Sequence, residues 1–136
     1  MKYMLDTNVL MHFANDERKR YKIEKHLDRI GRENTFVSSI TIHEVHTKLI
    51  KAKVSKSNID ALYAFLNVFT VRNFNTGAAV ESAKVRAVLE NAGDPIGDRD
   101  MLLAGHAKYE KATLVTNNTK HFKLVHGLKI EDWIGD

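Results

Sequence analysis

Short apolar segments alternate with longer helix-like segments along this 136-residue chain. Residues 3–5, 35–38 and 113–116 are uninterrupted short runs typical of buried strands. Between them, apolar residues recur at helical spacing, as in the stripe Ile42, Val45 and Leu49. Strands that alternate with helices favour a parallel sheet covered by helices on both faces. The pattern therefore predicts an α/β fold.

The remaining elements follow from apolar spacing and from turn residues. Residues 69–71 and 128–130 are the further strand-like segments. Three helices are expected in the first half: around residues 9–14, then through Ile23, Leu27 and Ile30 up to Gly31, and then along Ile42, Val45 and Leu49. Three more are expected after it: along Ile59, Leu62, Tyr63 and Leu66, then along Val80, Ala83 and Ala87 until Gly93-Asp94-Pro95, and finally from Asp100 along Leu103, Ala104 and Ala107.

Composition predicts one ordinary globular domain over residues 1–136. The chain has no repeat and no Gly/Ser linker, and 43% of its residues are hydrophobic, enough for a core. Because it contains no cysteine, a disulfide framework and a cysteine-ligated zinc site are excluded. The chain shows no signal peptide and no long apolar run, so a cytoplasmic location without membrane association is expected.

The chain is basic, with a formal net charge of +4. Lysines and arginines crowd residues 18–25 and again residues 48–56. Each cluster is either a solvated helix face or a polyanion-binding surface, and the sequence leaves both interpretations open. This charge permits a nucleic-acid partner without requiring one.

Two aspartates occupy positions that a core would disfavour. Asp6 directly follows the first strand, and Asp100 opens the apolar stripe of its helix, which points it toward the core. Asp6 could cap the next helix, but Thr7 or Asn8 could do so equally well, which leaves Asp6 free. Burying a carboxylate is costly unless it is paired, and a cation is the simplest partner for several carboxylates. These positions predict a metal site.

Glu44 has two ordinary explanations beside a functional one. Thr41 and Glu44 match a capping box, and Glu44 stands four residues before Lys48, which is a favourable helical pair. Its helix nevertheless starts just after the second strand, near the edge where Asp6 ends the first. This placement makes Glu44 a third candidate ligand.

The type of metal follows from the residues around these acids. His43 and His46 are three residues apart, so they do not match the four-residue spacing of the zinc-protease motif. Carboxylates without cysteine or a proper histidine pair suit Mg²⁺ or Mn²⁺. Asn117 and Asn118 end a later strand, where a turn is the common use of such a pair and a bond to a metal-bound water the less common one.

Four stretches of the chain together resemble the PIN-domain ribonucleases of the VapC type, the toxins of bacterial toxin–antitoxin pairs. They are Met4-Leu5-Asp6-Thr7-Asn8, residues 38–41 leading to Glu44, residues 95–97 leading to Asp100, and residues 114–119 with Phe122. The ending Gly127-Leu128 and Glu131-Asp132-Trp133 is also similar to that family. The resemblance covers essentially the whole chain in the right order.

The resemblance implies a PIN-like three-layer sandwich with a five-stranded parallel sheet, and a homodimer. It carries the family's acidic cluster onto Asp6, Glu44 and Asp100. The fourth position falls on Asn118, where many relatives have Asp, which weakens the case for a second metal. Either Asp98 or the Gly97 turn is expected to cap the Asp100 helix, and Asp98 is also kept as an outer-shell acid. A VapB-type antitoxin that threads a segment into the active-site groove is the implied partner.

The expected reaction is metal-dependent hydrolysis of an RNA phosphodiester. Asp6 and Asp100 would bind Mg²⁺, or Mn²⁺, with Glu44 binding directly or through water, while Thr116 and Asn118 position water or substrate. Sequence-specific RNA readers usually target unstacked loops, so a tRNA loop or another structured RNA loop, such as an exposed rRNA loop, is the expected substrate. The resemblance to the VapC family implies the tRNA anticodon loop foremost.

Two alternatives remain. One is a non-catalytic, dimerising RNA-binding module on the same fold, which would tolerate Asp100→Asn. The other is a phosphoryl-accepting receiver domain, which needs paired acids after the first strand and an acceptor Asp after the third. The chain has a single Asp after the first strand, and Val71-Arg72-Asn73 offers no acceptor.

Overall fold

A five-stranded sheet, all of whose strand pairs are parallel, runs through the computed structural model, which describes residues 1–135. The strands lie in the order β3-β2-β1-β4-β5, with β1 at the centre. Their bounds are β1 Tyr3–Leu5, β2 Thr35–Ser38, β3 Thr70–Arg72, β4 Thr113–Val115 and β5 Ile130–Glu131. The prediction of a parallel α/β sheet is confirmed.

Strand order excludes the receiver domain, whose sheet has the order 2-1-3-4-5. Here β3 pairs with β2 and not with β4, in the register Phe36 to Thr70 and Val37 to Val71. The receiver interpretation is therefore wrong.

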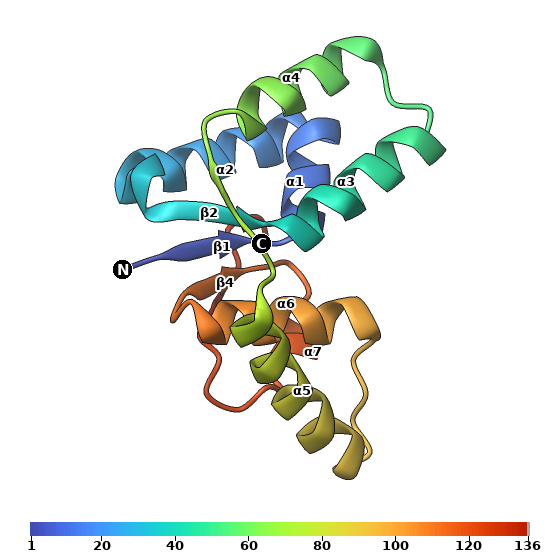
Figure 1. Cartoon of the computed structure of the whole chain (residues 1–136). Coiled ribbons are helices and arrows are strands. Elements are labelled where there is room, and N and C mark those ends of the chain that lie inside the picture. Colours follow the sequence, from blue (N-terminus) through green and yellow to red (C-terminus); the bar gives the residue numbers. More distant parts are fainter. Residues whose placement is uncertain (136) are drawn as a thin grey trace.

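Two helical layers cover the sheet (Figure 1). One layer holds α1 Thr7–Asn15, α2 Glu17–Ile30, α3 Ser39–Lys51 and α4 Lys56–Leu66, with the short 3-10 turn η1 Arg32–Asn34 before β2. The other holds α5 Thr76–Asn91, α6 Asp98–Tyr109 and α7 Thr119–Phe122.

The central strand divides its side chains between the two layers. Tyr3 and Leu5 pack with the α1–α4 core, whereas Met4 packs with the α5–α7 core. This is the alternation that a strand imposes on successive side chains. Because both faces are covered, all three residues of β1 are buried. Within residues 1–135 no helix is both long and apolar enough to span a membrane.

The expected helices are all present, but the buried face of α5 differs from the prediction. Val80 is 51% exposed, and Ala83 and Ala87 also face outward. The face that packs on α6 is Ala78, Ser82, Val85 and Leu89. The buried Ser82 donates a hydrogen bond from Oγ to the carbonyl oxygen of Met101, at 3.2 Å. Because the polar Ser82 lies in the contact face, apolar spacing did not identify the buried side of α5.

The α5–α6 contact depends on a glycine. A Cβ placed on Gly105 would lie 2.3 Å from the Cα of Ser82, so a side chain there would force the two helices apart. Close backbone approach explains why glycine, a poor helix former, stands inside α6.

We expect Gly105→Ala to lower the free energy of unfolding by about 1–3 kcal/mol, the usual cost of overpacking. This sign is opposite to the gain of up to about 1 kcal/mol that alanine gives an unstrained helix. Urea unfolding followed by circular dichroism measures it. Ala87→Ser on the exposed face of α5 is the control, with a change within about 0.5 kcal/mol. A more stable Gly105→Ala protein would contradict the close contact.

Candidate functional site

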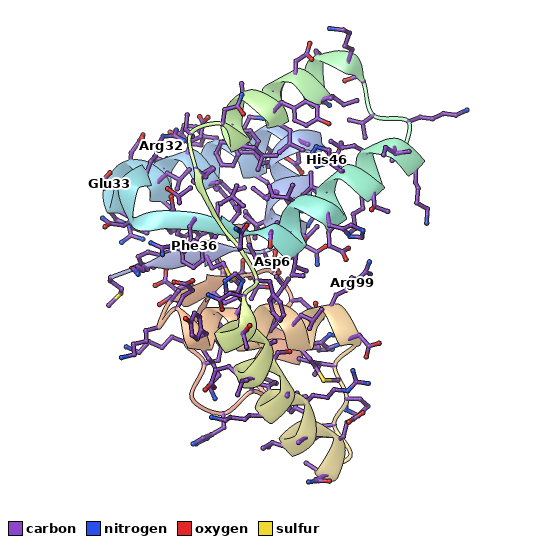
Figure 2. The ribbon with its side chains drawn as sticks, in the orientation of Figure 1. Asp6, Arg32, Glu33, Phe36, His46 and Arg99 are labelled. Carbon is purple, nitrogen blue, oxygen red and sulfur yellow. The ribbon has the colours of Figure 1, made fainter. Side chains whose placement is uncertain are left out.

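The carboxyl end of β1 lies where the chain connections leave the sheet on opposite sides. The chain from β1 runs through α1 and α2 in one layer, whereas the chain that reaches β4 comes from α5 and α6 in the other. A crevice opens at such a switch point, and ligands of open α/β sheets bind there. Figure 2 shows Asp6 in this position, between the two helical layers.

A polar pocket of about 170 Å³ occupies the crevice. Its lining consists of Asp6, Thr7, Asn8, Glu44, Lys48, Arg99, Asp100 and Leu103. The structure thus brings together the three acids predicted from the sequence, which come from the end of β1, from α3 and from the first turn of α6.

Asp6 is buried, with 3% of its surface exposed, and it is the N-cap of α1. Its Oδ1 accepts a hydrogen bond from the backbone N–H of Val9 at 3.0 Å. The prediction that Thr7 or Asn8 would cap the helix and leave Asp6 free is therefore wrong. Burial raises the pKa of Asp6 to about 6, since hydrogen bonds from Thr116 and Val9 only partly offset desolvation and Asp100 adds repulsion.

Glu44 is held by a partner that its sequence neighbourhood did not indicate. Arg99 Nη1 donates to Glu44 Oε2 at 2.6 Å across the pocket. In Figure 2 the Arg99 side chain reaches up from the start of α6 toward α3. The Glu44 side chain is 7% exposed and the Arg99 side chain 65%, so the pair sits at the pocket mouth.

Both ordinary explanations of Glu44 are wrong in this structure. Ser38 caps α3 by accepting from the N–H of Ile40, so Thr41 lies inside the helix and forms no capping box. Lys48 turns instead to Asn8, whose Oδ1 accepts from the ammonium at 3.3 Å.

Asp100 lies within a small polar cluster. Asn118 Nδ2 lies 3.4 Å from Asp100 Oδ2, and the same carboxylate oxygen lies 3.2 Å from His121 Nδ1. His121 also contacts Asn118 at 2.9 Å. Sequence reasoning missed His121, although its position three residues after Asn118 on α7 places both on one face of the helix.

Thr116 links the two aspartates to the loop after β4. Its Oγ1 accepts the backbone N–H of Asn118 at 2.9 Å, and its side chain hydrogen-bonds to Asp6. Asn117 instead donates to Asp132 at 3.3 Å. Of the two adjacent asparagines, Asn118 is the one that contacts an acid of the pocket, Asp100.

Asp98 does not join the pocket. Gly97 occupies the N-cap position of α6, so of the two expected caps the Gly97 turn is confirmed and Asp98 is wrong. Its side chain is 77% exposed and lies 3.5 Å from Arg86.

The donor set fits a hard cation better than zinc. Asp6 is a buried carboxylate that faces Asp100 and forms no ion pair among the described residues, and the pocket itself is lined by carboxylate, hydroxyl and amide oxygens. As the side chains lie, no group of three histidines and acids within residues 1–135 is close enough to hold an ion. One oxygen of Glu44 is occupied by the Arg99 guanidinium.

We expect Asp6→Asn to stabilise the protein in EDTA at pH 7.5 by about 1–2 kcal/mol. A folded-state pKa near 6, against 3.8 unfolded, corresponds to a cost of about 3 kcal/mol at neutral pH, and asparagine still caps the helix. Because the folded pKa is the higher one, the cost develops as pH rises from about 4 through 6. Urea midpoints at pH 4.5 and 7.5 should therefore show the gain only at the higher pH.

Asp16→Asn is the matched control for this measurement. Asp16 caps α2, and hydrogen bonds from the backbone N–H groups of Lys19 and Arg18 lower its pKa, so its ionised form is favoured. Its replacement should give no gain at pH 7.5. Equal gains in both variants would show that relief of burial at Asp6 is not the cause.

Residues 3–127 match the family model of the PIN domain. Ribonuclease VapC2 of Rickettsia felis is 36% identical over 134 residues, with 98% of each chain covered. The tRNA(fMet)-specific endonuclease VapC of Shigella flexneri is 30% identical over 137 residues, also with 98% of each chain covered.

Solved structures of VapBC complexes are also similar to this chain. The chain superposes on DNA-bound VapBC from Salmonella typhimurium with a TM-score of 0.88 and 31% identity, covering 98% of both chains. For VapBC2 from Rickettsia felis bound to a DNA fragment from their promoter, the TM-score is 0.84 and the identity 33%, covering 98% of this chain and 99% of the other.

Proposed function

This chain belongs to the PIN-domain family and, within it, to the VapC ribonucleases, and from that membership we propose that it is a metal-dependent endoribonuclease toxin. One observation carries the proposal: the structure gathers Asp6, Glu44 and Asp100 from three separate elements into one pocket at the carboxyl edge of the sheet. A fold has no structural need for three acids in one pocket, because they repel one another.

The residues divide the work of hydrolysis between them. Asp6, Asp100 and Glu44 would hold Mg²⁺ or Mn²⁺, which supplies Lewis-acid activation of water and offsets negative charge at the scissile phosphate. Thr116 joins Asp6 to the loop after β4 through its hydrogen bonds to Asp6 and to the N–H of Asn118. Asn118 positions water or substrate beside Asp100. Lys48 and Arg99, which also line the pocket, would contact phosphate oxygens.

The proposed substrate is a tRNA. Relatives from Shigella flexneri and Salmonella typhimurium are named tRNA(fMet)-specific endonucleases, at 30% identity each. We infer the anticodon loop as the cleavage site, because unstacked loop bases are open to recognition. Cleavage there would inhibit translation.

The proposed partner is a VapB-type antitoxin, as the VapBC complexes among the similar structures suggest. A segment of the antitoxin would enter the acidic pocket and block it. We also propose that the toxin is a homodimer. A non-catalytic RNA-binding module on this fold is the alternative, and the loss or retention of cleavage in Asp100→Asn decides between the two.

We expect purified protein to cut initiator tRNA into discrete fragments in Mg²⁺, and EDTA or Asp100→Asn to lower the rate by at least about 100-fold. Gel analysis of fragments from initiator and elongator tRNAs measures both activity and specificity. The control is Asp94→Asn, an exposed acid in the loop before α6, which should cut normally. Full activity of Asp100→Asn in EDTA would reject the metal-dependent mechanism.

We expect Arg99→Gln to bind Mg²⁺ or Mn²⁺ about two- to fivefold more tightly. A partly exposed ion pair contributes about 0.2–1 kcal/mol, and a cation that uses Glu44 must displace it. Calorimetric titration of EDTA-stripped protein measures the affinity. Arg86→Gln, which removes a cation paired with Glu90 and Asp98 outside the pocket, should leave it unchanged. Weaker binding by Arg99→Gln would mean that Arg99 does not compete with the ion.

A further inference from the structure

Helix α2 carries a basic face that the acidic pocket does not use. Lys19, Lys22, His26 and Arg29 recur at spacings of three and four residues, so they lie along one side of the helix. Lys25 stands beside this row and is exposed. From the first to the last of these residues the face is about 15 Å long.

The cations of this face form no ion pairs in the part of the chain that the structure describes, and Asp16, the acid near Lys19, is the N-cap of α2. Within residues 1–135 no ion pair joins any lysine or arginine of α2 to a carboxylate. Helix α5 is different, since its Lys84 pairs with Glu81 and its Arg86 with Glu90. The positive charge on this face of α2 is therefore available to bind a negatively charged partner.

Two histidines hold these cations in place without neutralising them. Lys19 Nζ lies 3.3 Å from His12 Nδ1, and Arg29 Nη2 lies 2.9 Å from His26 Nδ1. Burial lowers the pKa of both histidines, and the adjacent cations lower it further. Neutral imidazoles accept these hydrogen bonds and add no negative charge.

The face has a shallow hollow at one end and leads toward the acidic pocket at the other. Lys22, Lys25, His26 and Arg29 line an open hollow of about 470 Å³, whose floor includes the buried Trp133 stacked on His26 with ring centroids 4.9 Å apart. The Asp132 carboxylate there is engaged by the N–H groups of Ile134 and Gly135.

Lys48 connects the face to the acids. Its ammonium contacts Asn8 in the wall of the pocket, and it lies close enough to His12 to lower that pKa, as Lys19 does. A chain of positive charge thus runs from Lys48 past His12 and Lys19 to Arg29. A surface of this kind matches the phosphates of a nucleic-acid strand.

We propose that this α2 face, together with Lys48, holds the RNA backbone on one side of the scissile bond. The inference rests on the proposed ribonuclease function, and it assigns the substrate surface that this function requires. Arginine and lysine bind phosphates without reading sequence, so the surface contributes affinity and register rather than specificity.

The test compares two triple variants in the Asp100→Asn background, which prevents cleavage during binding. One is Lys19→Gln/Lys22→Gln/Lys25→Gln on the α2 face. The other is Lys2→Gln/Lys111→Gln/Lys129→Gln, whose lysines precede β1, β4 and β5 at the opposite edge of the sheet and remove the same charge. The probe is a transcript of the tRNA that the active protein cuts, or total tRNA if it cuts none, titrated from 50 to 300 mM KCl.

We expect the α2 triple to bind the tRNA about 10- to 100-fold more weakly at 100 mM KCl. The magnitude of its slope of log K against log salt should decrease by about two, since each single-strand phosphate contact contributes about 0.7. The opposite-edge triple should stay within about threefold. A Lys→Arg version of the α2 triple keeps the charge and should keep the affinity, which separates loss of charge from misfolding.

Three results would overturn the inference. Equal weakening of both triples would mean that only net charge matters. Undiminished binding by the α2 triple would leave the face to another partner, such as an acidic protein segment. If the unmodified protein cuts no RNA and Asp100→Asn binds none, both the α2 surface and the proposed ribonuclease function fail. If the unmodified protein cuts RNA normally, either of the first two results overturns the α2 surface alone.

Discussion

Burial of the Asp6 carboxylate is the constraint on which the site depends. Asp6 follows the central strand, so sheet and helices surround it on both sides, and its charge costs free energy that Thr116 and the N–H of Val9 only partly recover. Asp100 in the same pocket adds to that cost. Buried carboxylates with a raised pKa cluster at functional sites, and we propose that a bound cation offsets the cost at Asp6.

The position of the site follows from the connectivity of the sheet. Because β1 lies between β2 and β4, and the connecting helices lie in different layers, side chains from α1, α3 and α6 converge on its end. The central strand supplies apolar side chains to both cores, so all of its residues are buried. Arg99 reaches from α6 in one layer to Glu44 on α3 in the other, so a largely exposed basic side chain lies at the mouth of the acidic pocket. The basic face of α2 belongs to the same layer as Glu44, which places positive charge beside a negative pocket.

Local sequence predicted the elements well because short buried strands and helices with clear apolar spacing carry their own signal. It failed where a residue's role depends on a distant partner. The apolar spacing of α5 chose Val80, whereas the buried face contains Ser82, which packs under Gly105 of α6. Glu44 matched a capping box and a helical ion pair, yet it pairs with Arg99, 55 residues away along the chain. One helix cap also shifted, since Ser38 caps α3 in place of the expected Thr41.

The sequence by itself determined the fold class and two of the three acids, since strand and helix periodicity, the acid that follows β1 and the acid that opens the apolar stripe of α6 are local features. Glu44 became a candidate only through the place of its helix just after the second strand. Only the tertiary structure decided how the acids are arranged: that Asp6 caps α1 while facing Asp100, that Arg99 holds Glu44, and that His121 joins Asp100. It also decided that the α2 cations stand beside Lys48 and His12. The physical reason is that propensity acts between near neighbours, whereas burial and charge act between residues that only the completed sheet brings together.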